Sequence, residues 1–210
     1  MMFPFFPGAR EREPIELPLF PLKTVLFPGG VLPLRVFEQR YIEMTKTCLK
    51  DARPFGVVLL TKGAEVAPAA SGGLEFAPVG TLATIAQWDM PELGILHVTA
   101  IGSERFQLQT HDVKPDGLVV ARVARIPPEP VVALSSAFAP LVTLLEMLAA
   151  RVGPRQFPET AAYDDASWVG YRLAELLPLP MSIKQGMLEI NDADVRLGLL
   201  QKFLRQQGLV

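Results

Sequence analysis

Residues 20–41 read FPLKTVLFPGGVLPLRVFEQRY, and this stretch gives the strongest indication of the fold. It is almost wholly apolar, yet it carries prolines at positions 21, 28 and 33. Proline lacks the backbone N–H that a sheet ladder uses, so it is confined to edge strands, strand ends and turns. We therefore expect two short strands joined by a turn at Pro28, Gly29 and Gly30, with the other prolines at edge positions.

The remainder of the first 126 residues also has the pattern of strands. Short alternating or apolar segments are separated by Gly and Pro. The sequences DMPELG at 89–94, IGSE at 101–104 and KPDG at 114–117 predict turns between hairpin strands. The predicted strands are 15–22, 31–36, 55–61, 79–88, 93–101, 105–111 and 118–126.

Helices are predicted in two places. Within 38–51, Tyr41, Met44 and Cys48 recur at helical spacing and form one apolar face. Beyond residue 136 the pattern is helical throughout, and the helix opened by Ser182 and Gln185 shows a capping-box pattern. We expect an α+β protein with four parts: a ragged N-terminus at 1–14, a β-rich unit at 15–126, a linker at 127–136 and a helical unit at 137–210.

Composition limits the classes of function. The 210 residues are 50% hydrophobic and 20% charged, with a net charge of −2. Lys and Arg balance Asp and Glu in both parts of the chain, at 13 against 14 before residue 131 and 7 against 8 after it. Nucleic-acid binders normally carry a basic stripe, so we do not expect DNA or RNA as the main partner.

Two further features bear on location. There is no uninterrupted run of about 18 apolar residues, so no membrane span is expected. The single cysteine, Cys48, excludes an intramolecular disulfide and fits a reducing compartment, so we expect a cytoplasmic protein. On its helical face, Cys48 is interpreted as a small buried hydrophobe rather than a nucleophile.

Sequence patterns for catalysis are absent. There is no P-loop motif, no glycine pattern for dinucleotides and no Ser–Lys peptidase motif. His97 and His111 are the only histidines, too few for the usual metal-ligand clusters. We expect no cofactor, no metal and no enzymatic activity. One alternative stays open: a small-molecule site or hydrolase in which His97 or His111 lies in a pocket beside a carboxylate.

Three segments, in order along the chain, resemble the N-terminal substrate-binding domain of Lon proteases. They are LPLFPLKTVLFPGGVLPLRVFEQRY at 17–41, VGTLATIAQ with LHVTAIGSERFQL between 79 and 108, and SWVGYRLAELLPLPMSIKQGMLEINDADVRLGLL at 167–200. The resemblance implies a β-rich, PUA-like pseudo-barrel with one packed helix, followed by a small helical bundle. It carries over neither the ATPase nor the peptidase of Lon, so we expect a stand-alone member.

The resemblance also implies a function: binding of unfolded or flexible polypeptide segments, or of a protease or other protein partner. RNA binding is the alternative, because PUA-like folds often bind RNA. The oligomeric state is left open. We expect the contact surface to include apolar residues of the opening stretch, with the alternative that each simply fills the core. These candidates are Phe20, Leu26, Phe27, Phe37 and Tyr41.

Four residues of the Lon-like motifs are expected to be architectural: Glu38, Gly102, Arg105 and Phe106. In RFQLQT, Phe106 and Leu108 fall on one face of a strand and Arg105 on the other. We expect Glu38 and Arg105 to form an ion pair that links the first helix to the hairpin.

Overall fold

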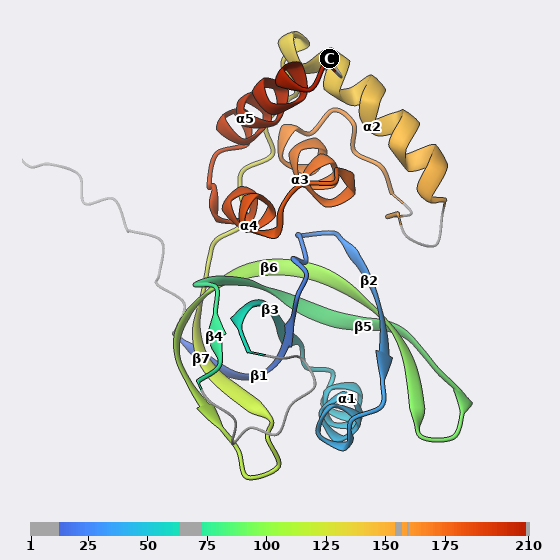
Figure 1. Ribbon diagram of the computed structural model, residues 1–210, viewed down its shortest axis with the longest axis vertical. Coiled ribbons are helices and arrows are strands. Elements are labelled where there is room, and N and C mark those ends of the chain that lie inside the picture. The colour runs from blue at the N-terminus through green and yellow to red at the C-terminus, as the bar shows by residue number, and fades with distance from the viewer. Residues whose placement is uncertain (1–12, 64–72, 154–156, 159, 209–210) are drawn as a thin grey trace, which may run out of the picture.

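The computed structural model describes residues 13–63, 73–153, 157–158 and 160–208. Within these residues the chain forms a β subdomain, made of seven strands and one helix, and a helical subdomain stacked on it (Figure 1). The β subdomain comprises β1 (Ile15–Leu22), β2 (Val31–Val36), α1 (Gln39–Asp51), β3 (Phe55–Lys62), β4 (Glu75–Phe76), β5 (Val79–Glu92), β6 (Ile95–Val113) and β7 (Val119–Arg125). The helical subdomain comprises the 3-10 turn η1 (Ser136–Phe138), α2 (Ala139–Val152), α3 (Ala166–Leu176), α4 (Met181–Glu189) and α5 (Ala193–Gln206).

The sheet closes on itself. Its strand order is β1-β7-β6-β5-β3-β4, and β1 also pairs with β3. That last pairing is parallel, with Leu19 opposite Gly56, whereas the neighbours along the rest of the path are antiparallel. The closure produces a small barrel, which leaves β1 and β3 without a long free edge. This architecture confirms the α+β fold class expected from the sequence.

Strand β6 replaces two predicted strands. The IGSE sequence was expected to form a turn, but residues 101–104 lie inside one strand that runs from Ile95 to Val113. Register shifts in the β5–β6 ladder show bulges between Thr81 and Ala83, which face this region. A bulge bends a strand without ending it, so Gly102 and Ser103 bend the sheet rather than reverse the chain.

The opening stretch forms β1, a turn and β2, as expected. Pro33 lies in β2, which pairs with β6 alone among the described strands. The turn is tied to β6 by two backbone bonds: Gly29 N–H donates to the Gly102 carbonyl at 2.8 Å, and Gly102 N–H donates to the Gly30 carbonyl at 2.9 Å. The apolar, proline-rich stretch at residues 20–41 therefore contributes a turn and an edge strand, β2, to the barrel wall.

The helix α1 covers one side of the barrel with the face predicted from its periodicity. Tyr41, Met44 and Cys48 are buried there, and Phe20 stacks on Tyr41 with ring centroids 4.1 Å apart. The helix ends at Asp51, and the residue that caps it, Ala52, has a left-handed φ of 49°.

The helical subdomain packs around α3, whose side chains are buried along almost its whole length. Asp165 and Asp192 cap α3 and α5, accepting hydrogen bonds from the backbone of Ser167 and Val195. The capping box predicted at Ser182 is wrong. Helix α4 begins one residue earlier, after Pro180, with no side-chain cap. In the described part of the chain, no helix is long and apolar enough to span a membrane.

Candidate functional site

Four of the five candidate contact residues are core residues. Phe20, Leu26, Phe27 and Tyr41 are between 0% and 8% exposed. Their side chains offer a partner almost no surface, which favours the alternative of core filling over the expected contact role. Phe37 differs, because 56% of its surface is exposed.

Phe37 marks the edge of a surface that we call the outer face, the solvent side of β2, β6 and β5. Alternation along β6 defines it: Leu96, Val98 and Ala100 are buried, whereas the residues between them are partly or largely exposed. The pairing registers place neighbours from β2 and β5 beside those residues. The outer face comprises Val31, Pro33, Arg35 and Phe37, then Ile95, His97, Thr99 and Ile101, then Thr84, Gln87 and Asp89.

A groove with a volume of about 490 Å³ lies on the outer face. The groove is lined by one row of polar side chains. Arg35 is opposite His97 in the β2–β6 ladder, and His97 is opposite Asp89 in the β5–β6 ladder. The Nε2 atom of His97 is buried and has no hydrogen-bond partner among the described residues. Asp89 instead accepts a bond from the backbone N–H of Met90 at 2.8 Å. The groove thus holds a histidine and a carboxylate without a hydrogen bond between them among the described residues.

Exposed apolar side chains also occur on the hairpin that joins β5 and β6, and this hairpin projects beyond the barrel (Figure 1). Trp88 is 56% exposed, Met90 40% and Leu93 fully exposed. Such a cluster on a monomer usually marks an interaction site.

A second hollow, of about 480 Å³, lies between α1 and the strands β1 and β7. Cys48 lines it, but burial raises the pKa of this thiol to about 11. The thiol is therefore protonated near neutral pH, and the reactive thiolate is scarce. This agrees with the interpretation of Cys48 as a core residue. Among the described residues, no group of three or more His, Cys, Asp and Glu could hold a metal ion.

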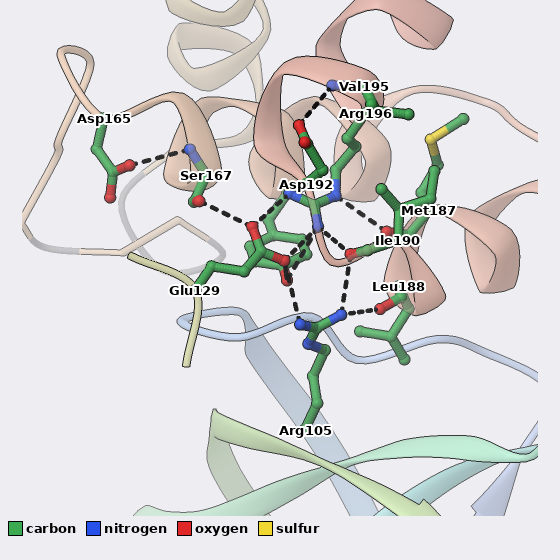
Figure 2. A network of polar contacts seen from close by, with 11 residues as sticks. Arg105, Glu129, Asp165, Ser167, Met187, Leu188, Ile190, Asp192, Val195 and Arg196 are labelled. Carbon is green, nitrogen blue, oxygen red and sulfur yellow. Dashed lines mark hydrogen bonds and ion pairs between the residues drawn. The ribbon is translucent and has the colours of Figure 1, made fainter. Parts of the chain in front are cut away.

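The most concentrated polar chemistry lies between the two subdomains, and we call it the Glu129 clamp (Figure 2). The carboxylate of Glu129 accepts hydrogen bonds from Ser167 Oγ at 2.8 Å, from the Tyr171 hydroxyl and from the guanidinium of Arg196. Arg105, from β6, lies 3.2 Å from the same carboxylate. Glu129, which lies between β7 and η1, therefore binds residues of α3, α5 and β6 at once.

The two arginines of the clamp also hold the turn between α4 and α5. Arg105 donates to the carbonyls of Leu188 and Ile190 at 2.7 and 3.0 Å. Arg196 donates from Nε to the carbonyl of Met187 at 3.0 Å. Both side chains are almost fully buried, at 3% and 0% exposed. One carboxylate cannot accept hydrogen bonds from all the N–H groups of two guanidinium groups. The backbone carbonyls accept some of the others, which lowers the cost of burying two cations.

The electrostatics of the clamp favour its ionised form. Burial alone raises the pKa of Glu129, but hydrogen bonds from Arg196, Tyr171 and Ser167 outweigh it, and the pKa lies below its ordinary value. Burial raises the pKa of Tyr171, so its hydroxyl stays protonated and donates. A carboxylate saturated in this way acts as a structural ion rather than a general base.

A second buried pair supports the same interface. Arg172 is fully buried and lies 2.6 Å from Glu175, and it donates to the Pro28 carbonyl at 2.8 Å. Burial raises the pKa of Glu175, with Arg172 and Lys184 opposing the shift. The proline turn of the opening stretch is thus bonded to α3.

The architectural motif residues fall at this interface or in the barrel core, with one error. Glu38 pairs with Arg40 at 2.7 Å, whereas Arg105 reaches Glu129. The predicted Glu38–Arg105 pair is therefore wrong, because the side chain of Arg105 points to the helical subdomain instead of α1. Phe106 is fully buried, and its ring leaves no room for a side chain at Gly80, where a Cβ would lie 2.4 Å from Cζ.

Sequence reasoning missed Glu129, Arg172 and Arg196. Charged residues within apolar helical segments could have indicated these positions. Arg172 lies among the apolar residues of α3, and Arg196 precedes the buried Leu197 of α5. Long cations in an apolar stripe require a partner, and the PPEP linker offers Glu129. The partner could not be chosen from the sequence, because it is 67 positions from Arg196.

Comparisons with known proteins agree with this architecture. Residues 16–206 match the model of the ATP-dependent protease La (LON) substrate-binding domain. The crystal structure of a Lon N-terminal domain protein from Xanthomonas campestris is 34% identical, covers 90% of this chain and 98% of that one, and superposes with a TM-score of 0.73. The Lon protease of Phenylobacterium zucineum is 27% identical over 95% of this chain but only 26% of its own length. Cereblon of Xenopus tropicalis is 31% identical over 53% of this chain and 24% of its own.

The fold defines the class of this protein: an α+β protein in which a small barrel precedes a helical bundle, here joined by buried ion pairs. The chain belongs to the family of Lon substrate-binding domains, as residues 16–206 show. The resemblance of the three motifs is confirmed. The chain spans about a quarter or less of the length of the Lon proteases it matches.

Proposed function

We propose that this protein is a non-enzymatic module that binds unfolded or flexible polypeptide segments through the outer face. The supporting observation is the gathering of exposed apolar side chains there and on the adjoining hairpin. Of the twelve large hydrophobic residues that are exposed in the described part of the chain, five lie in this region. They are Phe37, Trp88, Met90, Leu93 and Ile101.

The chemistry of the surface suits a polypeptide of mixed sequence. Apolar residues supply affinity by burial, and the Arg35, His97 and Asp89 row supplies polar partners of both signs. The groove has the volume of a typical ligand pocket, and Trp88 at the base of the hairpin lines it. Exposed apolar side chains on both the groove's surroundings and the hairpin favour an extended chain over a compact small molecule.

The test is binding of a fluorescein-labelled, cysteine-alkylated and chemically unfolded ribonuclease, measured by anisotropy. Replacing Phe37→Ser removes an exposed apolar contact at the edge of the outer face and is expected to weaken binding about fivefold or more. Val131→Ser is the matched control, because Val131 is 84% exposed in the linker and its loss lowers surface hydrophobicity elsewhere.

Wild-type protein that fails to bind at high micromolar concentration contradicts the proposal. So does equal weakening by Phe37→Ser and Val131→Ser. Binding of a mixed RNA pool with a steep loss of affinity as salt increases points instead to phosphate recognition.

A further inference from the structure

Strand β2 has one long edge without a strand partner in the described part of the chain. It pairs with β6 from Val31 to Val36 and lies off the closed path of the barrel. Closure gives β1, β6 and β7 partners on both sides, whereas β2, β4 and the outer half of β5 each keep one side without a strand partner among the described residues. Of these edges, that of β2 borders the groove and the outer face. Exposed edges are templates for pairing with another chain.

The direction of each backbone group along β2 follows from one hydrogen bond. Gly102 N–H donates to the Gly30 carbonyl, and continuing the register gives hydrogen-bonded pairs at every second residue. The groups of Leu32, Leu34 and Val36 therefore point to β6, and those between them point away. Pro33 is one of the residues whose backbone points away from β6, so its missing N–H removes no hydrogen bond from the β2–β6 ladder.

The free edge thus offers the N–H groups of Val31 and Arg35 and the carbonyls of Val31, Pro33 and Arg35. Alternating donors and acceptors at the spacing of a strand match the backbone of another extended chain. The side chains of the same residues lie on the outer face, next to the groove. Backbone pairing and apolar contact are consequently available to one ligand at one place.

We propose that an extended segment of a client polypeptide binds as an added strand along the free edge of β2. This inference rests on the proposed function and deepens it by naming the form of the substrate: a β-competent segment with apolar residues at every second position. Those residues would share the outer face with Val31 and Phe37. The intervening side chains would point to the opposite side of the sheet.

Pro33 selects a client strand over a second copy of this chain. Pairing two β2 strands about a two-fold axis centred on Pro33 places two residues without an N–H opposite each other, and the central pair of hydrogen bonds is lost. A client segment carries a full set of N–H groups and loses at most one bond at that position. Proline on an edge is a known protection against indiscriminate self-pairing.

The decisive variant is Arg35→Pro. It removes an N–H that points to the client and leaves the β2–β6 bonds intact, whereas Arg35→Ala removes the side chain and keeps that N–H. The probe is the fluorescein-labelled peptide KTVTFTVTK, followed by anisotropy. Arg35→Pro is expected to bind about fivefold more weakly than Arg35→Ala, the effect of one backbone hydrogen bond. Urea unfolding and circular dichroism verify that both variants fold.

A second measurement uses wild-type protein, so it stands even where Arg35→Pro folds poorly. Two versions of the peptide carry backbone N-methyl groups at either the odd or the even positions. Because an edge bonds every second residue of an added strand, one version loses binding and the other keeps it.

Equal affinity of both methylated peptides overturns strand addition, as does equal binding by Arg35→Pro and Arg35→Ala. Wild-type protein that binds unfolded ribonuclease but not the peptide rejects this inference alone and leaves the proposed function standing. A wild-type dimer in sedimentation that Arg35→Pro dissociates assigns the edge to a second copy and likewise overturns the proposal.

Discussion

At the residue scale, the clamp shows why a single linker carboxylate matters. Glu129 is 6% exposed and lies between the guanidinium groups of Arg105 and Arg196. Without it, two cations stay buried with only neutral acceptors, the backbone carbonyls and the Tyr171 hydroxyl, to stabilise them. Removing one partner of a buried ionic network costs more than the network contributes, because the remaining charge cannot return to water.

Glu129→Gln is therefore expected to lower the free energy of unfolding by about 3 kcal/mol, measured by urea denaturation. The control is Glu75→Gln. Glu75 pairs with Lys62 at 2.9 Å, but both side chains are at least 60% exposed. Surface pairs are worth about 0–1 kcal/mol. A loss of similar size in both variants contradicts the structural role of the clamp.

The pH dependence has a definite sign. The folded pKa of Glu129 lies below its ordinary value of 4.5, so its contribution is complete above pH 4.5 and is lost as pH falls towards the folded pKa. Wild-type stability should therefore fall below about pH 4.5 more steeply than that of Glu129→Gln. Comparing the two proteins cancels the effect of Glu175, whose pKa is raised by burial. Parallel pH profiles contradict the assignment.

At the scale of elements, β6 organises the molecule because it is the longest described strand and pairs with three others. It pairs with β2, β5 and β7 along its 19 residues, and it carries Arg105 towards the helices and Phe106 into the barrel. The sequence IGSE looks like a turn because Gly and Ser are turn residues. The same residues suit a bulged strand, and the packing of the β1–β2 turn against Gly102 decides between them.

Gly102→Ala tests that packing. A Cβ at this position would lie 2.3 Å from the backbone oxygen of Phe27, which no side-chain rotation can relieve. We expect a loss of about 2 kcal/mol or more in the free energy of unfolding. Gly186→Ala in α4 is the control, since an added Cβ there meets nothing within 4 Å and alanine favours a helix by about 0.8 kcal/mol. Equal effects contradict the close approach.

At the scale of the whole molecule, the Lon-like motifs that lie far apart in sequence meet at the interface of the two subdomains. The Pro28 turn bonds to Arg172, Val79 of β5 accepts from the Gln185 amide at 2.9 Å, and Arg105 bonds to the α4–α5 turn. The motifs thus describe how barrel and bundle are joined. The outer face lies elsewhere, on β2, β6 and β5.

Arg105→Met is expected to loosen the helical subdomain, because the Arg105 side chain reaches the carbonyls of Leu188 and Ile190 and the carboxylate of Glu129. Amide hydrogen exchange in α4 should accelerate about tenfold or more relative to β3. Arg125→Met is the control, since Arg125 pairs with Glu104 inside the β subdomain at 3.4 Å. Uniform acceleration of both subdomains by Arg105→Met contradicts a local interface role.

The sequence by itself determined the elements and the family. Alternation, helical spacing and prolines depend on neighbours along the chain, so the strands, α1 and the proline turn could be predicted. The Lon-like motifs gave the α+β layout for the same reason: each is a local string of residues. The division at 127–136 stays a prediction.

Only the tertiary structure decided which residues are core, clamp and surface. Phe20 and Phe37 have the same side chain and occur in one motif, yet one is buried under Tyr41 and the other is 56% exposed. Arg105 could have reached Glu38 or Glu129, and the stacking of the bundle on β6 selected Glu129. Burial and ion pairing are properties of residues distant in sequence, so one-dimensional spacing leaves them undetermined until the chain closes its barrel.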